Sequence, residues 1–190
     1  IANTMSQAKI DVLIHGALFS GPSRNKTAHH EVETIGTFNV LNACAEANIK
    51  KLIVTSATFV YGAYPKNPNF MTERTTPKPL GPDFVKSRVD AEQQIQEFAK
   101  DYSTCAVTVL RFAPILGPNS TNVRARYFVK GMVPKVLGYD PLLQFIHEED
   151  ALKALVLALS SEATGVFNVV GKGVIPLSTA VHLSGIIPIP

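Results

Sequence analysis

The sequence predicts an α/β protein with a parallel β-sheet that is covered by helices on both faces. Short apolar runs of strand length alternate along the chain with longer segments of helical periodicity. The short runs are apolar at nearly every position, which is typical of strands buried on both faces in a parallel sheet. With 46% hydrophobic residues and no internal repeat, the chain suits a single domain over residues 1–190.

The first half of the chain predicts a strand, a helix and a second strand. We expect strands at residues 10–14 (IDVLI) and 51–55 (KLIVT), with a helix at residues 29–47 between them. The inward-facing side chains of this helix are expected to be Val32, Ile35, Leu41 and Cys44. The proline-rich stretch 62–82 is expected to be irregular.

The second half begins with a helix that has a charged residue on its apolar side. Apolar residues recur at three- and four-residue steps from residue 84 to residue 98, and Arg88 lies on this stripe one turn after Phe84. A buried arginine is costly unless it meets a polar partner. Further strands are expected at residues 106–111, 142–146 and 166–170. A helix at residues 148–159 places Leu152, Leu155, Val156 and Leu159 on one face.

Charge and composition argue against several classes of function. The 18 basic and 15 acidic residues are spread along the chain without a basic block, so we expect no nucleic-acid partner. The apolar runs are too short for a membrane span and the first residues do not resemble a signal peptide, so a cytoplasmic protein is expected. Cys44 and Cys105 are distant from each other and from any histidine cluster, which predicts buried thiols and no metal site.

Ligands on parallel sheets of this kind bind beyond the carboxyl ends of the strands. The informative residues are therefore those directly after the strands, at positions 15–17, 55–57 and 112–114. The hydroxyls of Thr55 and Ser56 can either hydrogen-bond a substrate oxygen or satisfy the loop backbone, and the sequence leaves both alternatives open.

Each histidine has a structural alternative to a functional role. His15 can bind a ligand, or it can be half-buried and bonded to neighbouring backbone. His29 and His30 open a helix and are expected to be solvated. His147 precedes a helix start rich in acids, where capping explains it as well as catalysis does, and Asp150 is expected to cap that helix.

Two observations concern phosphate binding. Arg111 ends a strand, and Arg124 and Arg126 lie in a loop, where guanidinium groups suit an anionic substrate. A dinucleotide on such a sheet also requires a glycine-rich turn between strand and helix, and no G-x-G-x-x-G sequence occurs in the chain.

Six runs read together resemble the extended short-chain dehydrogenase/reductases, the NAD-dependent epimerases and dehydratases typified by UDP-glucose 4-epimerase. The runs are DVLIHGA, GTFNVLNACAEANIKKLIVTSATFVYG, FVKSRVDAE, VTVLRFAPILGPN, LLQFIHEEDALKAL and GVFNVVG, in the family's order. The resemblance implies a Rossmann-like sheet, with substrate-side elements at about residues 112–147 and 165–190. It also implies that the family's glycine-rich segment and closing helices lie outside these 190 residues.

The resemblance implies three catalytic positions, and the chain departs from the family's pattern at each. In the family, the tyrosinate of a Tyr-x-x-x-Lys pair takes a proton from a substrate hydroxyl, while the lysine lowers the pKa of the tyrosine and holds the nicotinamide ribose. Here the tyrosine position is Phe84, the lysine position Arg88 and the assisting hydroxyl position Ala57. Ser56, one residue from the expected hydroxyl, and Arg88 are therefore the candidate catalytic residues, and Tyr61 is expected to pack and position neighbours.

The resemblance further implies NAD or NADP as cofactor and a nucleotide-activated small molecule as substrate. The residues expected to contact the cofactor are His15, Ala17, Thr55, Ser56, Arg88 and Pro114. Asn119 and Gln144 are the candidates for substrate contacts. A homodimer formed through the helices at residues 31–47 and 84–101 is also implied.

Three functions stay open. The first is an epimerase or dehydratase in which another group replaces the missing tyrosine. The second is a catalytically impaired family member that binds a cofactor or ligand as a regulatory module, which the substitutions at Ala57, Phe84 and Arg88 favour. The third is a structural subunit whose sheet is completed by a partner.

Overall fold

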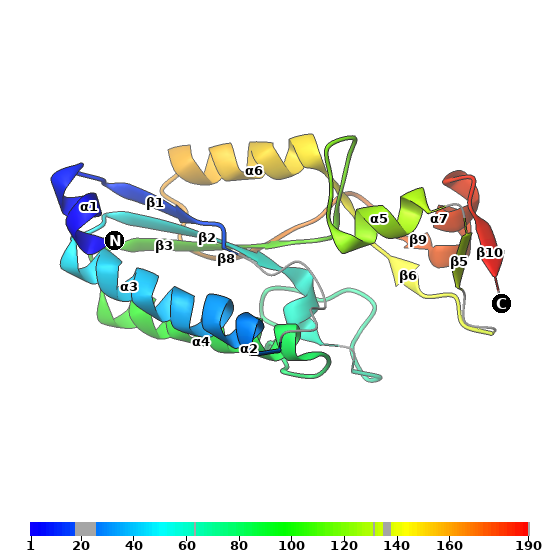
Figure 1. Ribbon diagram of the computed structural model, residues 1–190, viewed down its shortest axis with the longest axis horizontal. Coiled ribbons are helices and arrows are strands. Elements are labelled where there is room, and N and C mark those ends of the chain that lie inside the picture. Colours follow the sequence, from blue (N-terminus) through cyan, green and yellow to red (C-terminus); the bar gives the residue numbers. More distant parts are fainter. Residues whose placement is uncertain (18–25, 63, 131, 135–137, 190) are drawn as a thin grey trace.

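The centre of the molecule is a four-stranded parallel sheet (Figure 1). A computed structural model describes residues 1–17, 26–62, 64–130, 132–134 and 138–189. The strands, in their spatial order, are β1 (Val12–His15), β2 (Lys51–Ala57), β3 (Ala106–Phe112) and β8 (Gly165–Val169). The predicted α/β fold with a parallel sheet is therefore confirmed, and each of these strands begins and ends within two residues of its expected bounds.

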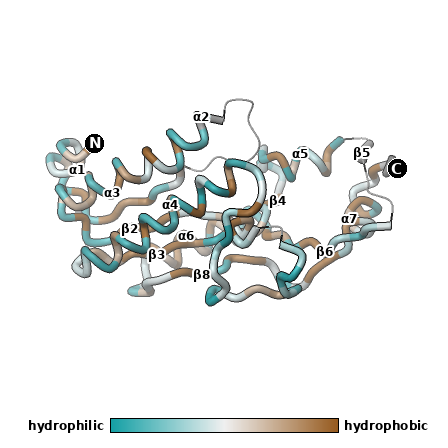
Figure 2. Tube along the Cα trace, turned by 90° about the horizontal axis from the view of Figure 1, so that it is seen from below, coloured by the Kyte–Doolittle hydropathy of each residue, from teal (hydrophilic) through white to brown (hydrophobic). Residues whose placement is uncertain are grey.

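Helices cover both faces of the sheet. The face below the sheet in Figure 1 carries α3 (Gly36–Glu46) and α4 (Asp83–Asp101), and the opposite face carries α6 (Glu148–Ser160). Alternate residues of β2 enter the two cores, since Leu52 packs with Ile95 of α4 while Ile53 packs with Ala151 of α6. Hydrophobic residues concentrate on the strands in Figure 2, whereas α3 and α4 alternate between hydrophilic and hydrophobic positions. This is the distribution expected for doubly covered strands and one-sided helices.

The helix expected at residues 29–47 is divided into three segments. These are α2 (Lys26–His29), a π-helical segment η1 (His30–Ile35) and α3, and α1 (Ala2–Gln7) precedes them all. The expectation that Val32 and Ile35 face inward is wrong, because they are 38% and 46% exposed. The wider π turns change which positions face the core, so that Glu33 and Thr37 are buried instead.

A second set of small elements lies beyond the carboxyl ends of the main strands (Figure 1). It contains α5 (Val123–Val129), β5 (Met132–Pro134), β6 (Leu142–Leu143), β9 (Ile175–Pro176), α7 (Leu177–Leu183) and β10 (Ile187–Ile189). Val181 and Ile186 form its core, with Tyr127 and Leu177 packed against them.

The single strand expected at residues 142–146 is wrong. Two separate short strands are present, since β6 pairs antiparallel with β9 while β7 (Ile146–His147) pairs parallel with β4 (Ile115–Leu116). Gln144 lies between β6 and β7, and its side-chain Nε2 donates to the carbonyl of Gly171 at 2.8 Å. The chain therefore changes partner in the middle of the apolar run. None of the described helices is both long enough and apolar enough to cross a membrane.

Candidate functional site

The carboxyl ends of β1, β2 and β3 meet at one edge of the sheet. Parallel pairing places His15 beside Val54, and Ala57 beside Phe112. The three segments predicted to contact a ligand, at positions 15–17, 55–57 and 112–114, are therefore neighbours. A 3-10 turn, η2 (Thr58–Tyr61), follows β2 and turns the chain away from this edge.

Arg88 connects α4 to this edge. Its guanidinium is fully buried, and it donates hydrogen bonds to the carbonyls of Ala17 at 3.1 Å and Thr55 at 3.4 Å. It also forms an ion pair with Glu33 of η1, which is equally buried. Burial lowers the pKa of Arg88, while the nearby carboxylates of Glu33 and Glu92 act in the opposite direction. Three of the residues predicted for the cofactor, Ala17, Thr55 and Arg88, are thus brought into one hydrogen-bonded unit.

Phe84, one turn before Arg88, lies in an aromatic group. Its ring meets the ring of Phe59 edge-on, with centroids 5.2 Å apart, and lies 6.0 Å from the imidazole of His29. The expectation that His29 is solvated is wrong, because only 3% of it is exposed, whereas His30 is exposed as expected. The contact with α4 buries His29, and nothing in the sequence marks that contact.

His15 closes the edge on the β1 side. Its Nε2 lies 3.1 Å from the hydroxyl of Thr37, and its carbonyl accepts from the hydroxyl of Thr55 at 3.5 Å. Burial lowers the pKa of His15, and the positive charge of Arg88 lowers it further. Both effects favour the neutral form of the imidazole.

Ser56 faces a second buried network. Its hydroxyl donates to Glu92, whose carboxylate receives the Nε of Arg111 at 3.0 Å and the Nη2 of Arg111 at 2.6 Å. Arg111 in turn donates to the hydroxyl of Tyr61 at 3.0 Å, and that hydroxyl donates to Asn168 at 2.6 Å. Arg111 was a candidate for binding an anionic substrate, but its guanidinium is instead paired with the carboxylate of Glu92. This network ties β2, β3, β8 and α4 together.

The other predicted site residues hold loops in place. Glu148 accepts from the backbone N–H of Asn119 at 3.1 Å and from its Nδ2 at 2.8 Å. The carbonyl of Pro114 accepts from the N–H of Ile146 at 3.2 Å.

The prediction that Asp150 caps α6 is wrong. His147 is the N-cap, and its side chain accepts from the N–H of Glu149, while Asp150 pairs with Lys153 at 2.9 Å.

A pocket of about 720 Å³ lies in the small elements beyond the sheet. Cationic side chains of Arg124, Arg126 and Lys130 and the rings of Tyr127 and Phe128 line it. Its other lining residues are Val123, Pro141, Leu143, Phe145 and Leu177. Because the wall joins positive charge to aromatic surface, the pocket suits a ligand that has both an anionic and a planar group. The arginines were predicted from the sequence, but the aromatic wall was not.

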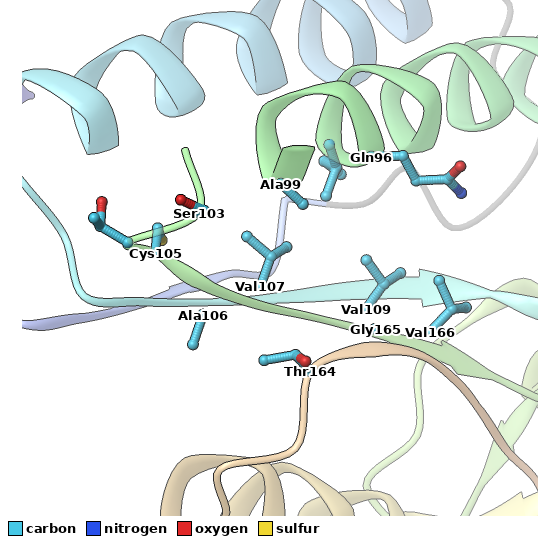
Figure 3. A pocket seen from close by; sticks show the side chains of 12 residues that line it. Gln96, Ala99, Ser103, Cys105, Ala106, Val107, Val109, Thr164, Gly165 and Val166 are labelled. Atoms are coloured by element: carbon cyan, nitrogen blue, oxygen red, sulfur yellow. The ribbon is translucent and has the colours of Figure 1, made fainter. Parts of the chain in front are cut away.

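A second pocket, of about 490 Å³, lies between the C-terminal half of α4 and the starts of β3 and β8 (Figure 3). Small apolar and hydroxyl side chains, with Cys105, line most of it. It is at the amino ends of the strands, away from Arg88, and none of its described lining residues is a lysine, arginine, aspartate or glutamate. Among the described residues, no group of three or more His, Cys, Asp or Glu could hold a metal ion.

The sequence of the chain is similar to those of known proteins. A model of the NAD dependent epimerase/dehydratase family matches residues 1–170. The uncharacterized protein Mb0513 of Mycobacterium bovis is 31% identical over 194 residues, which cover 100% of this chain and 52% of that protein. The chain therefore spans about half the length of this curated relative.

Two solved structures have the same fold as the chain. MoeE5 in complex with UDP-glucuronic acid and NAD gives a TM-score of 0.83 at 22% identity, over 96% of this chain and 63% of that one. UDP-glucose 4-epimerase of Thermus thermophilus in complex with NAD gives 0.82 at 18% identity, over 98% of this chain and 66% of that one.

Proposed function

Because the chain belongs to the NAD-dependent epimerase/dehydratase family, we propose that the full-length protein is an NAD(P)-dependent epimerase or dehydratase. Its substrate in this proposal is a nucleotide-activated sugar or a similar hydroxylated molecule. The observation that carries the proposal is the buried Arg88 unit at the carboxyl ends of β1 and β2, where ligands of such sheets bind.

The residues at this edge fit the nicotinamide half of the cofactor. The Nε of Arg88 is buried, and no described residue accepts a hydrogen bond from it, which leaves a donor for a ribose hydroxyl. Among the residues that the structure describes, a methyl group added at Gly16 would meet the hydroxyl of Thr55 alone, at 4.0 Å, which suits a close approach to the backbone there. We assign Ala17, Thr55 and Pro114 to the walls of this site. A nicotinamide held by these residues would supply hydride transfer to and from a substrate carbon.

The pocket between α5 and β6 is the observation that favours a nucleotide-activated substrate. Arg124, Arg126 and Lys130 suit the phosphates, and Tyr127 and Phe128 provide surfaces against which a base can stack. We assign this pocket to the substrate-side elements, whereas Arg88, on α4, contacts the carboxyl ends of the main strands. Asn119 and Gln144 lie in the loops that lead from the sheet to these elements, and we assign them to the substrate side.

The test of the proposal measures binding before turnover. The full-length protein is titrated with NAD⁺ and NADP⁺ by calorimetry, and then incubated with a panel of UDP- and dTDP-sugars while products are followed by chromatography. We expect one dinucleotide to bind and one sugar nucleotide to be converted. Binding of neither dinucleotide contradicts the proposal.

We propose as the second candidate a ligand-binding module that has lost proton transfer. Phe84 packs its ring against Phe59 and has no proton to exchange, and Arg88 is neutralised by Glu33, which favours this reading. Replacing Ala57, Phe84 and Arg88 by Ser, Tyr and Lys would then create oxidoreductase activity in a protein that lacks it. If the unmodified protein is already as fast as the triple variant, this second candidate is excluded.

The cellular compartment of the protein is also a proposal. Its two cysteines, Cys44 and Cys105, are free and buried, which suits a reducing compartment such as the cytoplasm. Burial raises the pKa of the Cys44 thiol to about 11, so this thiol is unreactive near neutral pH.

A further inference from the structure

We propose that Glu148 is a positioning residue for the pocket lined by α5, and that it sets the affinity of this pocket for an anionic ligand. The inference rests on the proposed function, because it takes the ligand to be the diphosphate of a nucleotide-activated molecule. Glu148 is outside the described lining of the pocket, yet it is hydrogen-bonded to the turn from which α5 begins.

The start of α6 and the turn before α5 are held side by side by two short strands. β4 pairs parallel with β7, and this pairing places Leu116 opposite His147. Each strand leads directly into one of the two segments, since Glu148 is the first residue of α6 and the turn at residues 117–122 leads to α5. The two segments are adjacent in Figure 1. The strand pairing therefore brings the side chain of Glu148 to this turn.

The carboxylate of Glu148 accepts three hydrogen bonds from the turn. Its oxygens lie 3.1 Å from the backbone N of Asn119, 2.8 Å from Nδ2 of Asn119 and 3.2 Å from Oγ of Ser120. The carboxylate also fills the space beside Gly117, where a Cβ would lie 2.4 Å from Cδ of Glu148. Hydrogen bonds to a carboxylate are stronger than those to a neutral acceptor, and a helix N-terminus favours negative charge. One half-buried side chain thus fixes the shape of the turn.

Asn122 extends this constraint to α5. Its Nδ2 donates to the carbonyl of Ile115 at 2.7 Å, and its Oδ1 accepts from the N–H of Ala125 at 3.0 Å as the N-cap of α5. The first turn of the helix is thereby fixed relative to β4. Arg124 and Arg126 lie on α5 and line the pocket, so the placement of their guanidinium groups depends on the turn.

Positioning and charge make opposite predictions for the loss of Glu148. A carboxylate near a pocket repels a diphosphate, so its removal would strengthen UDP binding if charge alone mattered. If Glu148 positions the turn, its removal weakens UDP binding, because the arginines must then be ordered when the ligand binds. Ordering one or two such side chains corresponds to a loss of about 10-fold in affinity.

The test is calorimetric titration of the full-length protein with UDP and with NAD⁺. We expect Glu148→Ala to weaken UDP binding by about 10-fold and to leave NAD⁺ binding unchanged. Glu149→Ala is the matched control, because Glu149 is the next residue of α6, is exposed and carries the same charge, and it should not weaken UDP binding.

A second variant displaces the carboxylate without removing it. Gly117→Ala introduces a methyl group where the side chain of Glu148 lies, and the φ angle of Gly117 is not positive, so the backbone permits alanine. This variant should reproduce the loss of UDP affinity, and it decides the question by itself if Glu148→Ala does not fold.

Two measurements separate positioning from a merely structural role. In a double-variant cycle, Arg126→Ala should cost less UDP affinity in Glu148→Ala than in the unmodified protein, since the arginine is no longer held in place. In hydrogen exchange, residues 117–130 should exchange faster in Glu148→Ala than in Glu149→Ala, while β2 and β3 exchange equally in both.

The outcomes distinguish this inference from the proposed function. If the unmodified protein and Glu148→Ala bind UDP equally well, only the inference is overturned. Additive losses in the cycle overturn it too, as does equal exchange of residues 117–130 in the two glutamate variants. If the unmodified protein binds NAD⁺ but not UDP, the nucleotide-activated substrate of the proposed function is refuted, and the inference is refuted with it.

Discussion

Two arginines in the described part of the chain are buried, and each is neutralised by a glutamate from another element. Arg88 pairs with Glu33, and Arg111 pairs with Glu92 through two of its nitrogens. Removing one partner of such a pair leaves an uncompensated charge in the interior, which is more costly than the loss of the contact alone. The two pairs therefore make stability sensitive to single substitutions at this edge of the sheet.

The Glu92 carboxylate gives the first prediction. We expect Glu92→Ala to lower the free energy of unfolding by about 3–5 kcal/mol, because Arg111 and the hydroxyl of Ser56 lose their acceptor in a buried site. Glu97→Ala, on the exposed side of the same helix, is the control and should change stability by less than about 0.5 kcal/mol. Urea unfolding followed by circular dichroism measures both, and equal effects would contradict the prediction.

The second prediction concerns pH. Because burial and then Arg88 lower the pKa of His15, the unfolded chain binds a proton at this residue from its ordinary value near 6.5 downward, while the folded chain binds it only at lower pH. Stability therefore falls as the pH falls below about 6.5, by at most about 1.4 kcal/mol per pH unit from this group. In His15→Gln we expect a smaller decline in the urea midpoint between pH 7 and pH 5. The exposed His182→Gln should retain the decline of the unmodified protein.

The burial of Arg88 was predictable from the sequence, but its partner Glu33 was not. The three- and four-residue spacing of apolar positions in α4 was sufficient to place Arg88 inside the molecule. Glu33 lies in a segment whose π-helical turns do not follow the 3.6-residue period, so the same rule assigned the inward positions to Val32 and Ile35. A buried charge whose partner comes from a distant segment leaves no local pattern in the sequence.

At the scale of elements, the long buried strands were predictable and the short ones were not. β2 and β3 are continuous apolar runs, and such runs predict buried strands directly. The two-residue strands β6 and β7 exist only because β9 and β4 pair with them. Their partners lie up to 34 residues away, a separation that propensity does not capture.

The helical layer gives a third prediction. Val32, Ile35 and Phe38 form an apolar strip on η1 and α3, with Phe38 54% exposed. If the protein forms the homodimer that the family resemblance implies, through these helices and α4, this strip is covered by the second copy. We expect sedimentation to show a dimer for the unmodified protein and a monomer for Phe38→Glu. Ser160→Glu, with the same added charge on α6, should remain dimeric, and a dimeric Phe38→Glu would contradict the proposed interface.

At the scale of the whole molecule, the main sheet and the small elements beyond it have separate cores and separate candidate sites. The sequence placed substrate-side elements at about residues 112–147 and 165–190 through a family resemblance. It did not reveal the pocket, because the lining comes from residues 123–130, 141–145 and 177, whose side chains meet only after folding. The shape of this pocket depends on contacts between segments that are distant in the sequence, and such contacts produce no periodic pattern in the sequence.

The separation of the two sites gives a fourth prediction. We expect Arg126→Ala to weaken UDP binding by about 10- to 100-fold, which corresponds to loss of a hydrogen bond between charged groups, and to leave NAD⁺ binding unchanged. Lys66→Ala, an exposed loop cation outside the pocket, is the control and should alter neither. Calorimetric titration with UDP and with NAD⁺ measures all four affinities. Parallel loss of both ligands in Arg126→Ala would contradict separate sites.

The order of charges on α4 has a consequence for how the helix docks. Arg88 and Glu92 are one turn apart on the same buried side, and each meets the opposite charge on a different element. Sliding α4 by one turn, about 5.4 Å along its axis, would bring Glu92 towards Glu33 and set two carboxylates against each other in the interior. Apolar side chains alone would tolerate such a slip. The opposite charges of Arg88 and Glu92 therefore restrict α4 to one position along its axis.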